Sequence, residues 1–307
     1  MSLTLESIEV LDAIARRGSF AQAALELGRV PSALTYTVRR LEEDLDVLLF
    51  DRRGHRAKLT PAGSELLEQG RQLLDAAAQI EKRVKQVATG WEPELRIVVD
   101  NIVPVPPLLK VCGEFFAEQA RMGGNSRVRM SGEVLMGTWE SLLDGRADLA
   151  IGVSGEPPGG GGVQCRLLGE IAFEFAVAPS HPLADVPEPV SAEMLRRHRA
   201  VAIGDTARTL PRRSTGLLSG QEVLTVPDLR AKLEAQKAGL GCGYLPRRTV
   251  LPEVRRGTLV IRRTEEAKPV GRIFCAWHSR DAGRALRWFV KRLDDARLRR
   301  QLLAGTD

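Results

Sequence analysis

The sequence, 307 residues long, predicts an α/β protein that opens with an all-α winged helix-turn-helix and continues into a long linker helix and an α/β domain. Three patterns indicate this fold class. Short amphipathic helices joined by a tight turn come first, apolar residues then recur at every seventh position, and after residue 90 short strands alternate with helices. A chain of this length is expected to form two or three domains.

The first two helices are indicated by their apolar spacing and their end residues. One is predicted over residues 5–16 and the second, rich in alanine, over residues 21–27. Ser19 and Gln22 are expected to form a capping box at the start of the second helix, and Gly28 suits the left-handed backbone that ends it. The inner face of the first helix is expected to consist of Leu5, Ile8, Leu11 and Ile14.

The helix predicted from Pro31 to Leu45 has one apolar face and one face of hydroxyls and a cation. No carboxylate interrupts the polar face before Glu42, and such chemistry suits a DNA groove. A solvated surface helix is the alternative, but the preceding helix and turn favour a helix-turn-helix. The buried stripe is expected at Leu34, Val38, Leu41 and Leu45. The residues expected to contact DNA are Pro31, Ser32, Thr35, Tyr36 and Arg39.

A short β-hairpin wing is predicted after this helix. Arg52, Arg53, Arg56 and Lys58 surround Gly54 with no acidic residue among them. Cations at the tip of a wing would contact phosphates and add salt-sensitive affinity, whereas base specificity would come from the helix. A solvated loop is the alternative interpretation.

A long helix is predicted from Pro61, which follows the capping residue Thr60, to about Val87. Gly70 and Ala77 are small enough to let a second helix approach closely. The pattern favours a dimer, whose two recognition helices would read two half-sites; a helix packed on its own domain is the alternative. The heptad series are Leu66, Leu73, Ile80, Val87 and Gly63, Gly70, Ala77, Val84. The expected seam is formed by Leu66, Leu73, Ala77, Ile80 and Val84.

The remaining two thirds of the chain are expected to form an α/β domain with a largely parallel sheet, where ligands bind beyond the carboxyl ends of the strands. The predicted strands are residues 95–99, 128–131 and 148–153, and the predicted helices are residues 106–118 and 138–143.

The overall charge does not by itself indicate a nucleic-acid partner. The net charge is +6, but residues 1–92 carry 13 lysines and arginines against 14 acidic residues, whereas the remainder carries 32 against 25. The positive balance therefore lies outside the helix-turn-helix, and DNA binding depends on local placement. No 18-residue apolar run and no secretory pattern occur, so a cytoplasmic protein without a membrane segment is expected.

Enzyme and metal motifs are missing from the sequence. The four cysteines and four histidines are scattered, without metal-ligand spacing, and scattered thiols are typical of a reducing compartment. The run Gly159–Gly162 lacks the lysine and hydroxyl residue of a phosphate-binding loop. We therefore expect no catalytic residues, no metal site and no cofactor, although dispersed ligands stay open.

Several runs, in this order, resemble the LysR-type transcriptional regulators, and the resemblance covers nearly the whole chain. Asp46 stands where that family usually has glycine, and aspartate tolerates the left-handed turn expected there. Tyr36 stands where many relatives carry a long polar or basic residue. The runs are residues 18–24, 31–35, 40–45, 49–52, 59–63, 142–152, 181–183, 238–241 and 245–246.

The resemblance implies an effector domain like a periplasmic binding protein, with two α/β lobes, two crossing strands and a small-molecule cleft. The crossings are expected near Ile151–Gly155 and Arg262–Val270. The implied domains are residues 1–60 for the winged helix-turn-helix, 61–90 for the linker helix and 91–307 for the effector domain. Its first lobe would hold residues 91–153 and 268–307, and its second lobe residues 154–267.

The resemblance also places a set of residues at the cleft. Relatives that bind small anions commonly have serine or threonine where this chain has Ile102 and Leu135. That loss, with aspartates at 100 and 205, argues against a simple carboxylate effector and points to a neutral, phenolic or cationic ligand; helix capping is an equal alternative for the aspartates. The implied lining is Asp100, Asn101, Ile102, Leu135, Gly204, Asp205 and Thr206.

Taken together, the sequence predicts a regulator of transcription that binds double-stranded operator DNA as a homodimer or homotetramer and responds to a small-molecule effector. RNA polymerase is a further candidate partner. Two other classes stay open: an enzyme with an attached DNA-binding domain, which a catalytic constellation would support, and a constitutive architectural DNA-binding protein, whose DNA affinity no effector would change.

Overall fold

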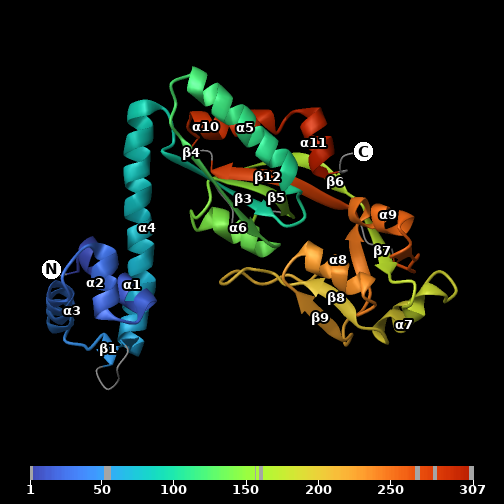
Figure 1. The fold of residues 1–307 in the computed structure, drawn as a ribbon, viewed down its shortest axis with the longest axis horizontal. Helices are drawn as coiled ribbons and strands as arrows, with labels where there is room; N and C mark the ends of the chain where they lie inside the picture. Colours follow the sequence, from blue (N-terminus) through green and yellow to red (C-terminus); the bar gives the residue numbers. More distant parts are fainter. Residues whose placement is uncertain are drawn as a thin grey trace. The chain divides into compact units, whose positions relative to one another are not determined.

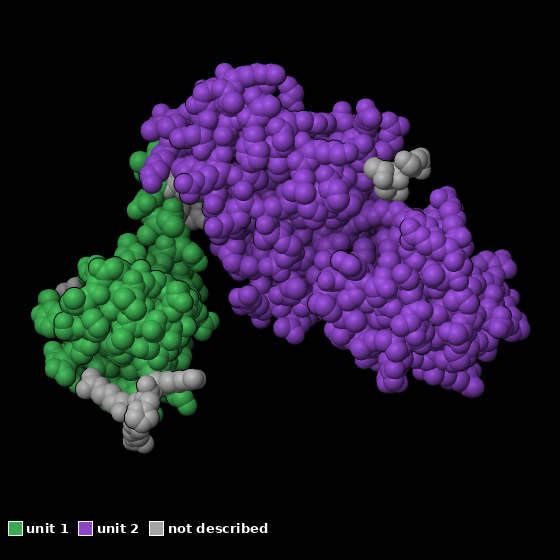
Figure 2. Space-filling view, viewed as in Figure 1, with its two compact units in different colours: residues 1–84 green, residues 85–307 purple. Residues whose placement is uncertain are grey.

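The computed structural model describes residues 3–51, 57–155, 157–158, 162–266, 270–278 and 282–303 (Figure 1). The chain divides into two compact units, residues 1–84 and residues 85–307 (Figure 2). Each unit is described below by itself.

The first unit begins with three helices, α1 (Leu5–Arg17), α2 (Phe20–Leu27) and α3 (Pro31–Leu45). Gly28 and Asp46 end α2 and α3 in the left-handed conformation, at φ values of 65° and 51°, as the sequence predicts. The expected capping box at Ser19 was wrong, because its side chain makes no capping hydrogen bond. A capping box occurs instead at α1, between Thr4 and Ser7.

The apolar faces of these helices form one core. Leu34, Val38 and Leu41 of α3 are buried against Leu11 and other residues of α1 and α2. Two expected core residues were wrong: Leu5 is 46% exposed and Leu45 is 41% exposed. Each stands at the end of its helix, where the apolar stripe runs past the neighbouring helices.

The wing consists of β1 (Phe50–Asp51) and β2 (Lys58–Leu59), which pair antiparallel with Phe50 opposite Leu59. The phosphate contacts expected from Arg52, Arg53 and Arg56 lie outside the described residues.

The linker helix α4 runs from Pro61 to Thr89. Its capping residue is Thr60, whose Oγ1 accepts the N–H of Gly63 at 3.0 Å. In its first turns the helix packs closely on its own unit. A Cβ on Gly63 would lie 2.1 Å from the carbonyl oxygen of Leu49, and one on Gly70 would lie 2.6 Å from Cγ2 of Ile8. Gly70 therefore serves an intrachain contact, which corrects its expected place at a helix–helix seam.

The second unit contains two lobes. The first lobe is built on a five-stranded sheet of order β4-β3-β5-β12-β6, in which β3 pairs parallel with β4 and β5 while β12 pairs antiparallel with β5 and β6. The sheet is thus mixed, and the expectation of a largely parallel sheet was wrong. The elements of this lobe are β3 (Glu94–Asp100), α5 (Val105–Arg121), β4 (Arg127–Glu133), α6 (Met136–Leu143), β5 (Leu149–Ser154), β6 (Val163–Ile171), β12 (Gly271–His278), α10 (Arg284–Arg292) and α11 (Ala296–Leu303).

The second lobe has an antiparallel sheet of order β10-β7-β11 and a parallel pair, β8 and β9. The expected first crossing at Ile151–Gly155 was wrong, because β6 still pairs along β12 in the first lobe and the chain enters the second lobe only at residue 172. It returns between residues 262 and 270. The elements are β7 (Phe173–Val177), η1 (Pro182–Ala184), α7 (Ala192–Arg196), β8 (Ala200–Ile203), β9 (Val223–Val226), α8 (Leu229–Lys237), β10 (Gly243–Pro246), α9 (Arg247–Arg255) and β11 (Val260–Ile261).

Helices cover both faces of the five-stranded sheet. Helices α5, α10 and α11 lie on one face, and α6 lies on the other (Figure 1). The first face buries Phe115 and Phe289 in the largest core cluster of this unit, and the second buries Trp139. This packing holds the carboxyl ends of β3 and β4 at the border with the second lobe.

Candidate DNA-binding surface and ligand cleft

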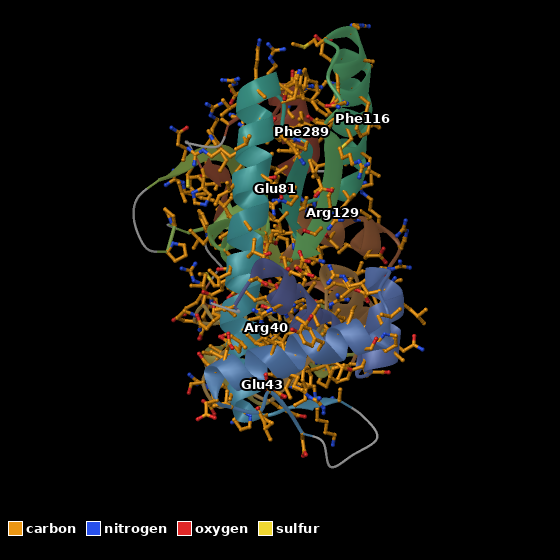
Figure 3. The ribbon with its side chains drawn as sticks, turned by 90° about the vertical axis from the view of Figure 1, so that its left-hand side faces the viewer. Arg40, Glu43, Glu81, Phe116, Arg129 and Phe289 are labelled. Atoms are coloured by element: carbon orange, nitrogen blue, oxygen red, sulfur yellow. The ribbon has the colours of Figure 1, made fainter. Side chains whose placement is uncertain are left out.

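The outer face of α3 has the chemistry predicted for contact with DNA. Ser32, Thr35, Tyr36 and Arg39 are exposed, with Tyr36 at 65%, whereas Leu34 between them is fully buried. Arg40 and Glu43 extend the charged surface along the same helix (Figure 3).

Existing hydrogen bonds and ion pairs determine which side-chain groups of α3 are available to bind DNA. The Oγ1 of Thr35 donates to the carbonyl oxygen of Pro31 at 3.0 Å, so this hydroxyl can offer its lone pairs but not its proton without breaking that bond. Arg39 has no ion-pair partner within the described part of the chain. A cation without a carboxylate beside it can bind a phosphate or a guanine edge with no competing ion pair.

Glu42 is a structural residue that the sequence analysis missed. Its carboxylate is only 5% exposed, and Oε1 accepts the N–H groups of Leu49 and Phe50 at 2.8 and 3.3 Å. The wing is thereby attached directly to α3. A helical pattern alone does not reveal this role, because the donors come from the following loop.

The expected dimer seam separates into two parts. Leu66 is partly buried against the core of its own unit. Leu73, Ile80 and Val84 are exposed, at 49%, 65% and 64%, and Ala77 is half-buried. The second half of α4 thus carries apolar residues that the described part of the first unit leaves exposed.

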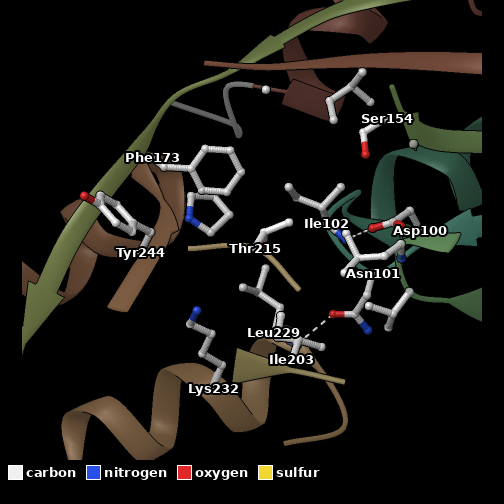
Figure 4. Close-up of a pocket in the computed structure, with 16 residues that line it drawn as sticks. Asp100, Asn101, Ile102, Ser154, Phe173, Ile203, Thr215, Leu229, Lys232 and Tyr244 are labelled. Carbon is white, nitrogen blue, oxygen red and sulfur yellow. Dashed lines mark hydrogen bonds between the residues drawn. The ribbon is translucent and has the colours of Figure 1, made fainter. Parts of the chain in front are cut away.

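A cleft of about 190 Å³ lies between the two lobes of the second unit (Figure 4). Of the residues expected there, Asp100, Asn101, Ile102 and Leu135 line it. The other lining residues of the first lobe are Val134, Gly152, Ser154, Gly271 and Ile273. The second lobe contributes Phe173, Ile203, Thr215, Leu229, Lys232, Tyr244 and Pro246.

Asp100 joins the turn after β3 to the start of α6. Its Oδ1 accepts the N–H of Ile102 at 2.9 Å, and its Oδ2 accepts from the N–H of Leu135 at 2.8 Å and the hydroxyl of Thr138 at 3.1 Å. Burial raises the pKa of Asp100 to about 6, against the lowering effect of these donors. The bond to Leu135 helps to fix that residue at a φ of 52°, a strained conformation for a leucine beside a cleft.

Gly204, Asp205 and Thr206 do not line the cleft, which corrects their expected place; their neighbour Ile203 does. They begin a segment of the second lobe, residues 204–213, that docks on the first lobe and that we call the strap. Asp205 accepts the N–H groups of Met136 and Gly137 at the start of α6, both at 3.3 Å. Thr206 packs so closely that a Cβ on Gly137 would lie 2.0 Å from its Oγ1.

Glu140 of α6 holds the middle of the strap. This nearly fully buried carboxylate accepts the N–H groups of Arg208, Thr209 and Leu210 and the hydroxyl of Thr209, at 2.6 to 3.1 Å. Burial opposes ionisation, but the N–H groups of Leu210 and Thr209 outweigh it and lower the pKa of Glu140 to about 2. The sequence analysis missed this residue, because its partners are about 70 positions away.

Lys232 is the cationic residue among those that line the cleft, and the sequence analysis missed it as well. It is only 8% exposed. Figure 4 shows its ammonium group reaching from α8 towards the space beside Phe173 and Tyr244. A lysine on an amphipathic helix looks like a surface residue in the sequence, so only the placement of α8 beneath the cleft reveals it.

The described residues contain no group of three or more histidine, cysteine, aspartate or glutamate side chains arranged to hold a metal ion. Within the same residues, no helix is both long and apolar enough to cross a membrane.

Two protein families match this chain. Residues 5–64 match the family described as "Bacterial regulatory helix-turn-helix protein, lysR family", and residues 88–297 match the family described as "LysR substrate binding domain". Together the two matches cover the three helices, the wing and most of the two-lobed unit.

Curated relatives match over nearly their full length. The uncharacterized HTH-type transcriptional regulator YeeY of Escherichia coli (strain K12) is 39% identical over 289 residues, which is 94% of this chain and 92% of that protein. The probable HTH-type transcriptional regulator YhaJ of the same organism is 40% identical over 292 residues, 95% of this chain and 96% of that protein.

Solved structures share the fold. Full-length CbnR in complex with its target DNA has a TM-score of 0.61 and 20% identity, covering 95% of this chain and 99% of CbnR. The probable transcriptional regulator PA0477 from Pseudomonas aeruginosa has a TM-score of 0.54 and 20% identity, covering 95% and 96%.

Proposed function

This chain belongs to the LysR family of transcriptional regulators, as a DNA-binding regulator with an effector-binding domain, and we propose that it binds its operator as a homodimer or homotetramer and changes its activity when a small molecule occupies the cleft. Such a protein acts in the cytoplasm. RNA polymerase is the proposed partner in transcription.

The exposed face of α3 supports the proposed contact with operator DNA. Ser32, Thr35, Tyr36 and Arg39 would face base edges, while the buried Leu34 and Val38 hold the helix on its unit. Arg52, Arg53 and Arg56 are proposed to add phosphate contacts, and Pro31 to start the helix at the groove.

The exposed stripe of α4 supports the proposed dimer. Leu73 and Ile80 are seven residues apart, and Val84 follows one turn later in the second heptad series. Their exposure in a single chain would cost free energy that a second helix removes. Two joined chains would present two recognition helices to a near-palindromic operator.

The lining of the cleft supports an apolar effector with one acidic group. Asp100 offers little to a ligand, since both of its oxygens already accept hydrogen bonds, and Asp205 caps α6 outside the cleft. The two aspartates therefore give no support to a neutral, phenolic or cationic ligand, and only the apolar Ile102 and Leu135 in the lining still favour one. Lys232 beside Phe173 and Tyr244 is the single observation that favours an aromatic or branched carboxylate.

A footprint of the DNA upstream of the gene for this chain, with increasing sodium benzoate and related monocarboxylates, tests the proposal. A ligand should change the protected region or the protein concentration that gives half protection. Lys232→Gln should raise the required ligand concentration about 10- to 100-fold, the loss of one charge-assisted hydrogen bond, with the unliganded footprint unchanged.

Arg230→Gln is the matched control, because Arg230 lies on the same helix and is exposed outside the cleft. If no carboxylate changes the footprint, or if both variants shift the response equally, the proposed role of Lys232 is wrong. If the footprint responds only to neutral ligands, the proposed effector-binding function stands and the proposed carboxylate class of effector is wrong.

A further inference from the structure

We propose that the second lobe carries a second ligand site, for an apolar amine, in a cavity between α7 and β10. The cavity has a volume of about 380 Å³ and lies next to the cleft, with which it has Thr215 and Tyr244 in common. Figure 4 shows the hydroxyl of Tyr244 pointing away from the cleft. Because this residue lines both spaces, its ring stands between them.

The wall of the cavity offers apolar surface to a ligand. Leu217 and Leu218 line it from the loop that follows the strap, and Tyr244 lines it from β10. All three side chains are only partly buried, so they keep surface that a ligand can cover. Removing that surface from water favours a ligand with an apolar group.

The aromatic part of the wall is held in place. The ring of Phe175, which also lines the cavity, packs on the ring of Tyr244 with 5.3 Å between their centroids and 73° between their planes. The hydroxyl of Tyr244 lies 2.7 Å from the Oγ1 of Thr264 and donates to the carbonyl oxygen of Glu266 at 2.8 Å. A ligand would therefore meet a preformed aromatic surface.

The rim of the cavity is acidic. Glu265 and Glu266 line it, and the described lining residues include no lysine or arginine. One carboxylate oxygen of Glu265 accepts the N–H of Ala192 at 3.2 Å, which holds this side chain at the start of α7. Neither glutamate forms an ion pair with another residue in the part of the chain that the structure describes.

This combination favours an apolar amine over other ligands. An ammonium group is attracted both by the face of an aromatic ring and by a carboxylate, and the cavity offers Tyr244 together with Glu265 and Glu266. The apolar group of the same ligand can cover Leu217 and Leu218. An anion would be repelled by the rim, and a neutral ligand would gain only the apolar contacts.

Isothermal titration of the full chain with phenethylamine, an apolar amine that is protonated at pH 7, tests this site. The wild-type chain should show a saturable site. Glu265→Gln combined with Glu266→Gln should weaken it about 10-fold or more, because the charge-assisted contacts are lost. Glutamine keeps an acceptor oxygen for the N–H of Ala192, so α7 should stay in place. Neutral phenethyl alcohol should also bind about 10-fold more weakly than the amine.

The matched control is Glu193→Gln combined with Glu222→Gln, which removes the same charge from exposed positions of this lobe outside the cavity. It should leave the binding of phenethylamine unchanged. A third variant, Ile102→Trp, fills part of the cleft and not the cavity. It should also leave this binding unchanged, since Lys232 makes the cleft unfavourable for an amine.

The proposal is overturned if no saturable binding of phenethylamine occurs or if the alcohol binds as tightly as the amine. It is equally overturned if the control pair weakens binding as much as the Glu265 and Glu266 pair does, or if Ile102→Trp abolishes it. Each of these results would leave the proposed effector function of the cleft untouched, because that function is measured by the footprint with carboxylates.

Discussion

At the scale of the residue, the exposed face of α3 carries an aromatic ring and, next to it, a hydroxyl group. Tyr36 projects a large ring into solvent at 65% exposure, and Thr35 stands beside it with its proton donated to Pro31. Neither side chain contributes to the buried core. Both side chains are therefore available for the proposed contact with DNA.

Thr35→Ala and Tyr36→Ala should each weaken specific operator binding by roughly 1 to 3 kcal/mol, because a base contact is lost. Binding to random DNA should stay nearly the same, because phosphate contacts remain. Fluorescence anisotropy with operator and random duplexes measures both values. Thr37→Ala is the control, since Thr37 is partly buried. An equal loss on both duplexes would contradict base reading by these residues.

At the scale of the element, α4 has two different tasks along one helix. Its first turns pack on α1 and the wing, where Gly63 and Gly70 leave room for Leu49 and Ile8. Its later turns present Leu73 and Ile80 to solvent. A heptad pattern describes both halves equally well, since packing inside one chain and packing between chains require the same apolar spacing.

Leu73→Glu or Ile80→Glu should therefore separate the proposed dimer and leave each chain folded, because a carboxylate in an apolar seam would have to be desolvated. Leu67→Glu should instead destabilise the first unit, since Leu67 is only 6% exposed in its core. Sedimentation equilibrium and thermal unfolding distinguish the two effects. If the Leu73 and Ile80 variants remain dimers, the seam lies elsewhere.

At the scale of the whole molecule, the two lobes of the second unit are joined by more than their crossing strands. The strap attaches to Glu140 and the start of α6, and Arg248 of α9 donates to the carbonyl oxygens of Leu302, at 2.9 Å, and Ile102. Ile102 lines the cleft. These contacts therefore limit how far the two lobes can move relative to each other when a ligand binds, unless the contacts break.

Glu140→Gln should lower the free energy of unfolding of the second unit at pH 7, because an amide offers one acceptor oxygen in place of a carboxylate. The folded pKa of Glu140, about 2, lies below its ordinary value of 4.5. Its contribution is therefore present above pH 4.5 and is lost as the pH falls towards 2. Urea denaturation across this range should show that the free energies of unfolding of the wild-type chain and of Glu140→Gln become equal as the pH falls towards 2.

Glu193→Gln serves as the control, because the ion pair that Glu193 forms with Arg197 is exposed. It should follow the wild-type chain at every pH. A constant difference between wild type and Glu140→Gln from pH 7 to pH 2 would show that the carboxylate charge does not hold the strap.

The sequence by itself determined the features that depend on neighbouring residues. The three helices, the left-handed ends at Gly28 and Asp46, the start of α3 at Pro31 and the length of α4 follow from capping and periodicity, which act within a few positions. The motifs were specific enough, in combination, to predict the family. Asp100, Asn101, Ile102 and Leu135 also reach the cleft, because residues after parallel strands gather at one sheet edge.

Only the tertiary structure decided which distant groups meet. Glu42 and Glu140 are buried because loops outside their helices bring N–H groups to them, and Lys232 faces the cleft because α8 packs beneath it. Likewise β6 belongs to the first lobe because β12, about 110 positions later, pairs with it. Contacts of this range depend on how whole elements pack, and a local pattern of apolar and polar residues carries no information about that.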